Sequence, residues 1–326
     1  MKKEIEVIVS KELKGKLVEI TELTGGYFGH VYKVMVEISS GLKPFAIKIV
    51  NSEKEKSFRD ESSDNRVYGS RWSNLKPAQQ LLTENGFVVP KIFSIGALKS
   101  YRKNYSIMEF IEGEPVVDLL KTQDASRIKQ LHGLAGDVLG KMHKIKRDFQ
   151  GWVDMKCPYD KDWEIAFFES FNSHLKNAIE KNSYISHNKS RILEFVSQKR
   201  KLWANPNKFV FSHTDGFQGL SKLEKGNWTL TSIIDCEDNQ FTDQRFVLSG
   251  LELALEFENK TLHSKFWERY KQHTDIDPGH LNLKGVFKLY YLLSWTPVAY
   301  DSGRHTFTEQ DRGISRIENL IAGLVH

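Results

Sequence analysis

The sequence of 326 residues predicts an α+β protein with two lobes, a small β-rich N-terminal lobe and a larger, mainly helical C-terminal lobe. Up to about residue 110, short segments alternate apolar and polar side chains, the period-two pattern of β-strands. From about residue 117, apolar side chains recur every three or four residues, as in amphipathic helices. A strand-rich insertion at 209–235 interrupts the helical part. We therefore expect the lobes to comprise residues 1–110 and 111–326.

The N-terminal lobe is expected to hold five strands and one helix. The helix covers 67–85 and ends at Gly86, since glycine commonly terminates helices. The segment TGGYFG, 24–29, separates the first two strands. The predicted strands are 16–23, 30–38, 44–50, 88–98 and 104–111.

The C-terminal lobe is expected to be built from helices around the 209–235 insertion. The clearest helix, 127–145, spaces its apolar residues at three and four positions. We found no internal repeat and no low-complexity tail. The other predicted helices are 163–180, 190–203, 245–258, 263–273 and 283–295.

Composition argues against several classes of protein. The net charge of +5 is mild and the basic residues are dispersed, so the chain lacks the basic stripe of nucleic-acid binders. No apolar run approaches the roughly 18 residues that a membrane span requires. Charges throughout the first 16 residues do not fit a signal peptide, and the two distant cysteines fit neither a zinc site nor a disulfide framework. These observations predict a soluble cytoplasmic protein, and they make no prediction about its oligomeric state.

Two carboxylates in the 209–235 insertion are the strongest functional candidates. Asp215 follows the apolar run FVFSH, and Asp235 follows LTSII, 20 positions later. At the ends of neighbouring strands, one carboxylate can orient a hydroxyl while the other holds a metal ion, as phosphoryl transfer requires. Glu237 and Asp238 follow at once, and such a group of acids is costly unless a cation lies among them. His213 is expected to brace this loop by hydrogen bonding.

A glycine-rich turn and a lysine lie upstream of these acids. Gly25, Gly26 and Gly29 between two strands allow backbone N–H groups to approach phosphate oxygens, although glycines in a hairpin often serve only the turn. Lys48 lies 19 residues after Gly29 within the apolar strand PFAIKIV. It is either an exposed edge lysine or, after such a turn, a candidate to pair with phosphates.

The segment SIMEFIEGEP, 106–115, leads from a strand into a turn. Its backbone can offer donors and acceptors to an adenine edge, with Met108 packing beside the base. We assign Met108, Glu109 and Ile111 as nucleotide-binding candidates. The alternative is an ordinary strand end followed by a loop.

Taken together, the order and spacing of these motifs resemble the aminoglycoside phosphotransferase and choline kinase-like family, distant relatives of protein kinases. The resemblance covers nearly the whole chain. TGGYFGHVYKV resembles the nucleotide loop, AIK the strand lysine, IMEFIEGEP the hinge and LGKMH the helix after the hinge. FSHTDG resembles the H-x-D catalytic loop, and IIDCED the metal-binding segment. The resemblance implies a bilobal protein-kinase-like fold.

The resemblance also implies roles for individual residues. Asp215 would accept or orient the proton of a substrate hydroxyl, Asp235 would bind Mg²⁺, and Lys48 would hold the α- and β-phosphates of ATP or GTP. The acceptor would be a small molecule, and an aminoglycoside-type antibiotic, which would link the protein to antibiotic resistance, is one candidate. A choline-like alcohol or a sugar is another.

The chain departs from the family pattern in three places. Leu220 stands where the family has a metal-binding asparagine, so Gln218 becomes the candidate second metal ligand. Thr242-Asp243-Gln244 only partly matches the G-D-P pattern, and Val247 occupies the position of a later aspartate. The acidic partner of Lys48 is either Glu61, which we favour for its longer side chain, or Asp64. The Leu220 departure leaves open a pseudokinase that binds nucleotide without transferring phosphate.

A polycationic substrate would favour acids in the helical lobe. The alternative is that such acids lie on ordinary solvated helix faces. A protein kinase is disfavoured, because no A-P-E segment or long activation loop follows Asp235. The candidate acids are Asp160, Asp162, Glu164, Glu169, Glu252, Glu256 and Glu258.

Overall fold

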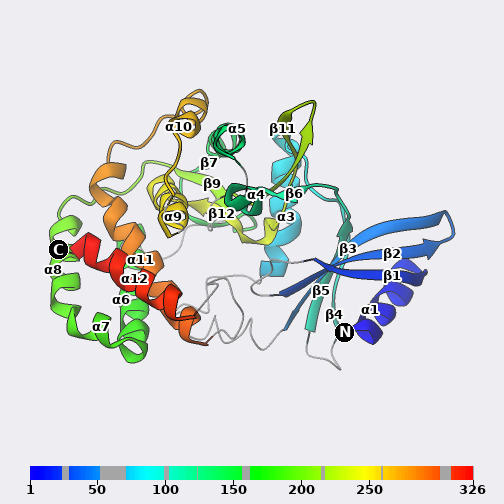
Figure 1. Cartoon of the computed structure of the whole chain (residues 1–326), viewed down its shortest axis with the longest axis horizontal. Helices are drawn as coiled ribbons and strands as arrows, with labels where there is room; N and C mark the ends of the chain where they lie inside the picture. The colour runs from blue at the N-terminus through cyan, green and yellow to red at the C-terminus, as the bar shows by residue number, and fades with distance from the viewer. Residues whose placement is uncertain are drawn as a thin grey trace.

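The structure is a computed structural model, and it has the two lobes that the sequence predicts. It describes residues 1–23, 29–51, 71–98, 103–122, 124–155, 162–213, 217–257, 260–301 and 310–325. A β-sheet forms one end of the molecule, helices gather at the other, and the two chain ends lie in different lobes (Figure 1). The predicted α+β bilobal fold is therefore confirmed.

An antiparallel sheet of five strands forms the N-terminal lobe. Its strand order is β1-β2-β3-β5-β4, so β3 lies at the centre. The strands are β1 (Lys16–Leu23), β2 (Gly29–Ile38), β3 (Gly41–Asn51), β4 (Ile92–Leu98) and β5 (Lys103–Glu109).

The alternation of β3 sets the direction of Lys48. Ile47 and Ile49 are buried in a core that includes α1 (Lys2–Ile8). Successive side chains on a strand point to opposite faces, so Lys48 and Val50 face away from α1. Val50 packs in a second core together with residues of α3 (Arg71–Glu84) and of the C-terminal lobe. Lys48 therefore points toward the boundary between the lobes.

The N-terminal helix is an element that the sequence analysis did not predict. α1 continues into the short π-helical segment η1 (Val9–Leu13), and Ile5, Ile8 and Val9 are fully buried against the sheet. The charged residues that argued against a signal peptide lie around this apolar stripe. An amphipathic helix thus covers the face of the sheet opposite Lys48.

Two small sheets begin the C-terminal lobe. One has the order β11-β10-β6, and the other β7-β9-β12-β8. β6 is the last part of the predicted hinge segment, 106–115, and pairs with β10. The strands are β6 (Glu114–Pro115), β7 (Lys146–Arg147), β8 (Gly151–Trp152), β9 (Phe209–His213), β10 (Gly219–Glu224), β11 (Asn227–Ile233) and β12 (Asn239–Thr242).

Helices form the rest of this lobe. A core of aromatic and aliphatic side chains joins α6, α8, α9, α11 and α12, far from the N-terminal sheet (Figure 1). The helices are α4 (Val116–Thr122), α5 (Ala125–Met142), α6 (Trp163–Lys181), α7 (Ser183–His187), α8 (Lys189–Arg200), α9 (Gln244–Phe257), α10 (Ser264–Tyr270), α11 (His280–Asp301) and α12 (Gln310–Val325). α4, α7 and α12 were not predicted from the sequence. Among the described residues, no helix is both long enough and apolar enough to cross a membrane.

A charged cluster links α9 to α11 and makes stability depend on pH. Glu252 lies 3.0 Å from the Nζ of Lys288 and 3.4 Å from the Nε2 of His280, and Lys288 also bonds Glu256. Burial by itself raises the pKa of Glu252. The hydrogen bond from His280 and the attraction of Lys288 and Lys284 outweigh it, so the pKa falls to about 2 from its ordinary value of 4.5.

We expect Glu252 to contribute stability that acid removes. The lowered pKa means that the contribution is complete above pH 4.5 and is lost as the pH falls toward about 2. It amounts to about 3 kcal/mol, because each pKa unit corresponds to about 1.4 kcal/mol. Urea unfolding of the wild type and Glu252→Gln between pH 3 and pH 7 measures it. The difference between the two proteins should shrink below pH 4.5, and a difference that stays constant would contradict the assignment.

Candidate active site

Lys48 meets two acids of the C-terminal lobe. Its Nζ donates hydrogen bonds to Oδ1 of Asp235 and Oε1 of Glu237. The side chains of Lys48 and Glu237 are 13% and 7% exposed, whereas Asp235 is 37% exposed. Burial alone lowers the pKa of Lys48, but the two carboxylates outweigh it and the net pKa is raised. The ammonium therefore stays charged and joins the two lobes.

The backbone turns sharply at Asp235. This residue follows β11 and has φ 62° and ψ 38°, the left-handed conformation that few residues other than glycine adopt. The single 3₁₀ turn η3 (Cys236–Asp238) begins there, and Ile234 N–H donates to the carbonyl of Gln218 at 3.2 Å. Such backbone strain persists where surrounding contacts hold it, and it clusters at functional sites.

Asn74 on α3 holds η3 in place. Its amide nitrogen donates to the carbonyls of Glu237 at 3.0 Å and Asn239 at 2.8 Å, while its oxygen accepts from Val153 N–H at 3.0 Å. The side chain is fully buried. Because buried polar groups cost free energy when they lose their partners, this asparagine ties α3, η3 and the residue after β8 into one unit.

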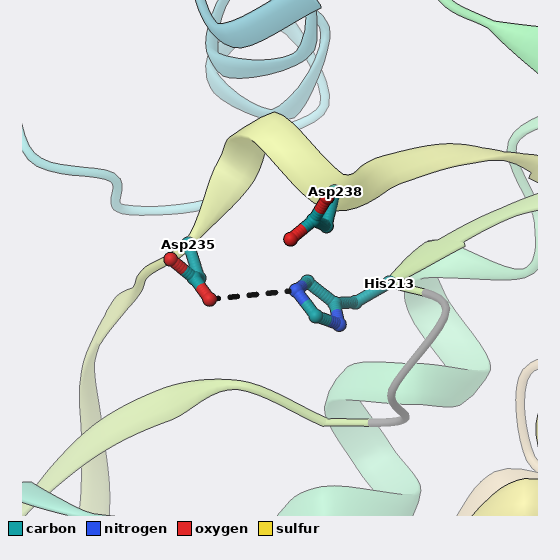
Figure 2. Close-up of side chains that lie close together, drawn as sticks. All are labelled: His213, Asp235 and Asp238. Carbon is teal, nitrogen blue, oxygen red and sulfur yellow. Dashed lines mark ion pairs between the residues drawn. The ribbon is translucent and has the colours of Figure 1, made fainter. Parts of the chain in front are cut away.

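His213, Asp235 and Asp238 form a cluster of possible metal ligands (Figure 2). β9 and β12 pair antiparallel with His213 opposite Asn239, which brings the imidazole beside the residue just before β12. The Nε2 of His213 lies 3.9 Å from Oδ2 of Asp235. One ligand atom from each of the three residues lies within 4.8 Å of the others.

These residues fit a divalent metal ion. Carboxylate oxygens are the protein ligands that Mg²⁺ prefers, and one or two of them suffice because the ion retains water and substrate phosphate ligands. Asp235 is the most exposed member and gives the cluster an open side. Cys236 lies within the same turn, but burial and the charges of Glu237 and Asp235 raise the pKa of its thiol. Cys236 therefore remains a neutral thiol.

The predicted nucleotide-binding residues in the described part lie on or beside the five-stranded sheet of the N-terminal lobe. Gly29 begins β2, and a side chain there would come within 2.7 Å of the carbonyl oxygen of Ile49, so the position requires glycine. Met108 pairs with Ala46 across the sheet, and Ile111 follows the end of β5. Glu109 N–H donates to the carbonyl of Lys91 at 2.8 Å, so this amide is already engaged.

Several predicted residues lie outside the described residues. These are Gly25, Gly26, Glu61, Asp64 and Asp215. The partner that we favoured for Lys48, Glu61, is therefore untested, and the described partners are Asp235 and Glu237.

Leu220, which stands where the family has asparagine, and Gln218, the alternative ligand, lie at or next to the start of β10. Gln218 is half-buried and precedes this strand. Leu220 pairs with Pro115 of the hinge strand β6 and with Ser232 of β11. A side chain on Gly113 would come within 3.0 Å of the Leu220 Cβ, so Leu220 packs beside the hinge.

Sequence reasoning missed two features of this site. The helix that contains Asn74 was predicted. Nothing in the sequence indicated that this single polar residue would bond three backbone groups of other elements. His213 was expected as a brace, and the structure places it beside two carboxylates. The signal for Asp238 was present, because the run of acids after Asp235 pointed to a cation.

The acids considered for a cationic substrate are largely engaged with protein groups. Asp162 accepts from Asn205 at 2.8 Å, and Glu164 pairs with Arg200 at 2.7 Å. Glu252 and Glu256 belong to the α9–α11 cluster. Asp160 and Glu258 lie outside the described residues.

Solved structures share this fold across nearly the whole chain. An amicoumacin kinase is 15% identical with a TM-score of 0.61, over 99% of this chain and 96% of its own. A spectinomycin phosphotransferase is 14% identical with a TM-score of 0.57, over 99% and 98%. A choline kinase of Streptococcus pneumoniae is 16% identical with a TM-score of 0.56, over 99% and 98%. At such identities these likenesses establish the fold.

Sequence comparison gives the family. No curated protein sequence matches the chain significantly. The model of the phosphotransferase enzyme family matches residues 73–244, a span that includes the hinge, His213, Asp235 and η3. Because this span is more than half of the chain, the protein belongs to the phosphotransferase enzyme family.

Proposed function

We propose that the protein is a Mg²⁺-dependent kinase that transfers the γ-phosphate of ATP or GTP to a hydroxyl group of a small molecule. The observation that carries this proposal is the contact of Lys48, from the N-terminal sheet, with Asp235 and Glu237 of the C-terminal lobe. Phosphoryl transfer is chiefly positioning and charge neutralisation, and a lysine and a metal-binding carboxylate at one point supply both.

Each candidate residue has a role in this proposal. Asp235 holds Mg²⁺, which neutralises the charge of the phosphates when it is bound. Lys48 pairs with the α- and β-phosphates, and Asp215 accepts or orients the hydroxyl proton. The glycine turn covers the phosphates. The candidates for the turn and the nucleotide base are Gly25, Gly26, Gly29, Met108, Glu109 and Ile111, with Glu61 as a further partner of Lys48 and Gln218 as a further metal ligand.

Nucleotides bound to structural neighbours support this proposal. The amicoumacin kinase was solved with AMP-PNP, Ca²⁺ and Ami, and the spectinomycin phosphotransferase with ADP and spectinomycin. Another neighbour, an aminoglycoside phosphotransferase, was solved with GDP and kanamycin. ATP and GTP are therefore both candidate phosphate donors. The pseudokinase alternative, based on Leu220, gains no support from membership in a phosphotransferase family.

We further propose that the lobes divide at about residue 110 and that the enzyme acts in the cytoplasm, where nucleoside triphosphates are abundant. The division is supported by the end of β5 at Glu109 and by the pairing of β6 with β10. Among the described acids considered for a cationic substrate, Asp162, Glu164, Glu252 and Glu256 are bonded to basic or amide groups of the protein. This favours a neutral or weakly cationic acceptor, and antibiotic resistance would follow only if that acceptor is an antibiotic.

A phosphorylation screen tests the proposed function. ATP or GTP with Mg²⁺ is offered with a panel of amino alcohols, sugars, ketosamines and aminoglycosides, and phosphorylated products are identified by mass spectrometry. We expect product from at least one class. No product from any class, with a folded protein that binds nucleotide, would overturn the proposal.

Replacing Lys48 should impair the reaction found in that screen. Lys48→Met removes the charge that pairs with the phosphates, and we expect kcat/KM to fall by about a hundredfold, as when one transition-state donor is lost. Lys43→Met, on the same strand but in its exposed part, is the matched control and should change little. Equal activity of the two variants would show that Lys48 does not contribute to the reaction.

A further inference from the structure

We propose that His213 and Asp238 join Asp235 as direct ligands of the divalent metal ion, with the imidazole nitrogen replacing the ligand that Leu220 cannot supply. The inference deepens the proposed function, since it concerns the metal of the same site. It assigns a mixed nitrogen and oxygen ligand set to a site for which carboxylate and amide oxygens alone were expected.

The spacing of the three side chains supports a single ion. Ligand atoms lie about 2.0–2.2 Å from an ion of this size, so two ligands of one ion are separated by about 3–4.4 Å. The Nε2 of His213 and Oδ2 of Asp235 are 3.9 Å apart, inside this range. All three ligand atoms lie within 4.8 Å of one another, so closure around an ion requires shifts of a few tenths of an ångström.

The two oxygens of Asp235 face different partners. Oδ1 accepts from Lys48, whereas Oδ2 faces the imidazole of His213 (Figure 2). A metal ion beside Oδ2 therefore need not displace the lysine. One carboxylate can join the ammonium that holds the phosphates to the cation that neutralises them.

The burial of the cluster of His213, Asp235 and Asp238 favours a bound cation. The side chains of His213 and Asp238 are buried, and a buried carboxylate near a second one is stabilised by a positive charge between them. Asp235 is the most exposed of the three, so water and phosphate oxygens can complete the coordination from its side. His213 and Asp238 come from β9 and η3, which the β9–β12 ladder and Asn74 hold together.

The position of Leu220 explains why other ligands are required. It lies in β10 opposite the hinge residue Pro115, and it offers no donor atom to a metal. Imidazole is a common ligand of first-row transition-metal ions, whereas Mg²⁺ is bound mainly by carboxylate, carbonyl and water oxygens. We therefore test the imidazole ligand with Mn²⁺, a paramagnetic first-row ion that these carboxylates also suit.

Pulsed electron paramagnetic resonance of bound Mn²⁺ tests the proposal in the absence of nucleotide. A directly bound imidazole adds ¹⁴N modulation to the Mn²⁺ signal, and labelling the histidines with ¹⁵N replaces it without any substitution. We expect this nitrogen signal in the wild type. A Mn²⁺ complex without nitrogen coupling, or no Mn²⁺ binding at all, would overturn the proposal.

Variants assign the signal to the cluster. His213→Gln should abolish the nitrogen coupling, and both His213→Gln and Asp238→Asn should weaken Mn²⁺ binding by at least about tenfold, the loss that even an outer-shell partner causes. His273→Gln is the matched control, because His273 also lies beside a carboxylate, Asp137, at 2.7 Å. Retention of the coupling in His213→Gln would overturn the assignment. If that variant does not fold, the ¹⁵N experiment and the affinity of Asp238→Asn decide.

The result separates this inference from the proposed function. Phosphoryl transfer by an enzyme whose Mn²⁺ lacks nitrogen coupling would overturn the ligand set and leave the kinase intact. Nitrogen coupling in a protein that phosphorylates nothing in the screen would support the ligand set and count against the kinase.

Discussion

Asp215→Asn is expected to lower kcat by about 10²–10⁴-fold while the protein keeps its fold, because a positioned proton acceptor contributes about that much to catalysis. Asp215 lies two residues after His213, which ends β9, and four residues before Gly219, which begins β10. Asparagine has the same shape but cannot accept the hydroxyl proton. The measurement is steady-state turnover with the acceptor found in the screen.

Nucleotide binding and stability separate loss of catalysis from loss of structure. The variant should retain its affinity for the metal nucleotide and its unfolding midpoint, since neither depends on the proton acceptor. Asp137→Asn on α5, which loses an ion pair with Lys141 outside the site, is the matched control and should keep full turnover. Wild-type turnover by Asp215→Asn would show that another group accepts the proton.

Arg245→Met is expected to lower the free energy of unfolding by about 3–5 kcal/mol, because it leaves a buried charge without its counter-ion. Arg245 and Asp243 are 2% and 0% exposed, and the Nη2 of Arg245 lies 2.6 Å from Oδ2 of Asp243. Trp163 Nε1 also donates to Asp243 at 3.0 Å, which is not enough to neutralise the carboxylate. Urea unfolding at neutral pH measures the loss.

A double variant tests the cause of that loss. Asp243→Asn retains an oxygen for the Arg245 backbone N–H, which donates to Oδ1 of Asp243 at 2.9 Å. In Asp243→Asn/Arg245→Met both charges are absent, so its destabilisation should be smaller than the sum of the single effects. Lys208→Met, in an exposed pair with Asp148, should cost less than about 1 kcal/mol. Additive effects would mean that the arginine acts through packing.

The longer strands and most of the long helices, α12 excepted, were predicted because their signals are local. Period-two alternation identified β1 and β2, a short apolar run identified β3, and three- and four-residue spacing identified α5 and α6. α1 was missed because its apolar residues are few and lie among charges, so its burial depends on the sheet that it covers. α7 is only five residues long, and its pattern is too short to detect.

The candidate site was predicted in part for the same reason. Asp215, Asp235 and Lys48 each stand in a motif that can be read along the chain. Their order in the sequence identified them without any knowledge of the distance between them. The pairing of Lys48 with Glu237, and the approach of His213 to Asp238, carry no such pattern, because each joins residues on separate strands or turns.

The sequence by itself determined the two lobes, the positions of the glycine-rich, lysine and acidic motifs, and the absence of asparagine at position 220. Only the tertiary structure decided which side chains meet. The register of β9 with β12 brings His213 to Asp238, the left-handed turn at Asp235 aims its carboxylate, and Asn74 fixes that turn from another element. Local patterns follow from the geometry of one strand or helix, whereas these contacts depend on how distant segments pack, and only the folded chain fixes that.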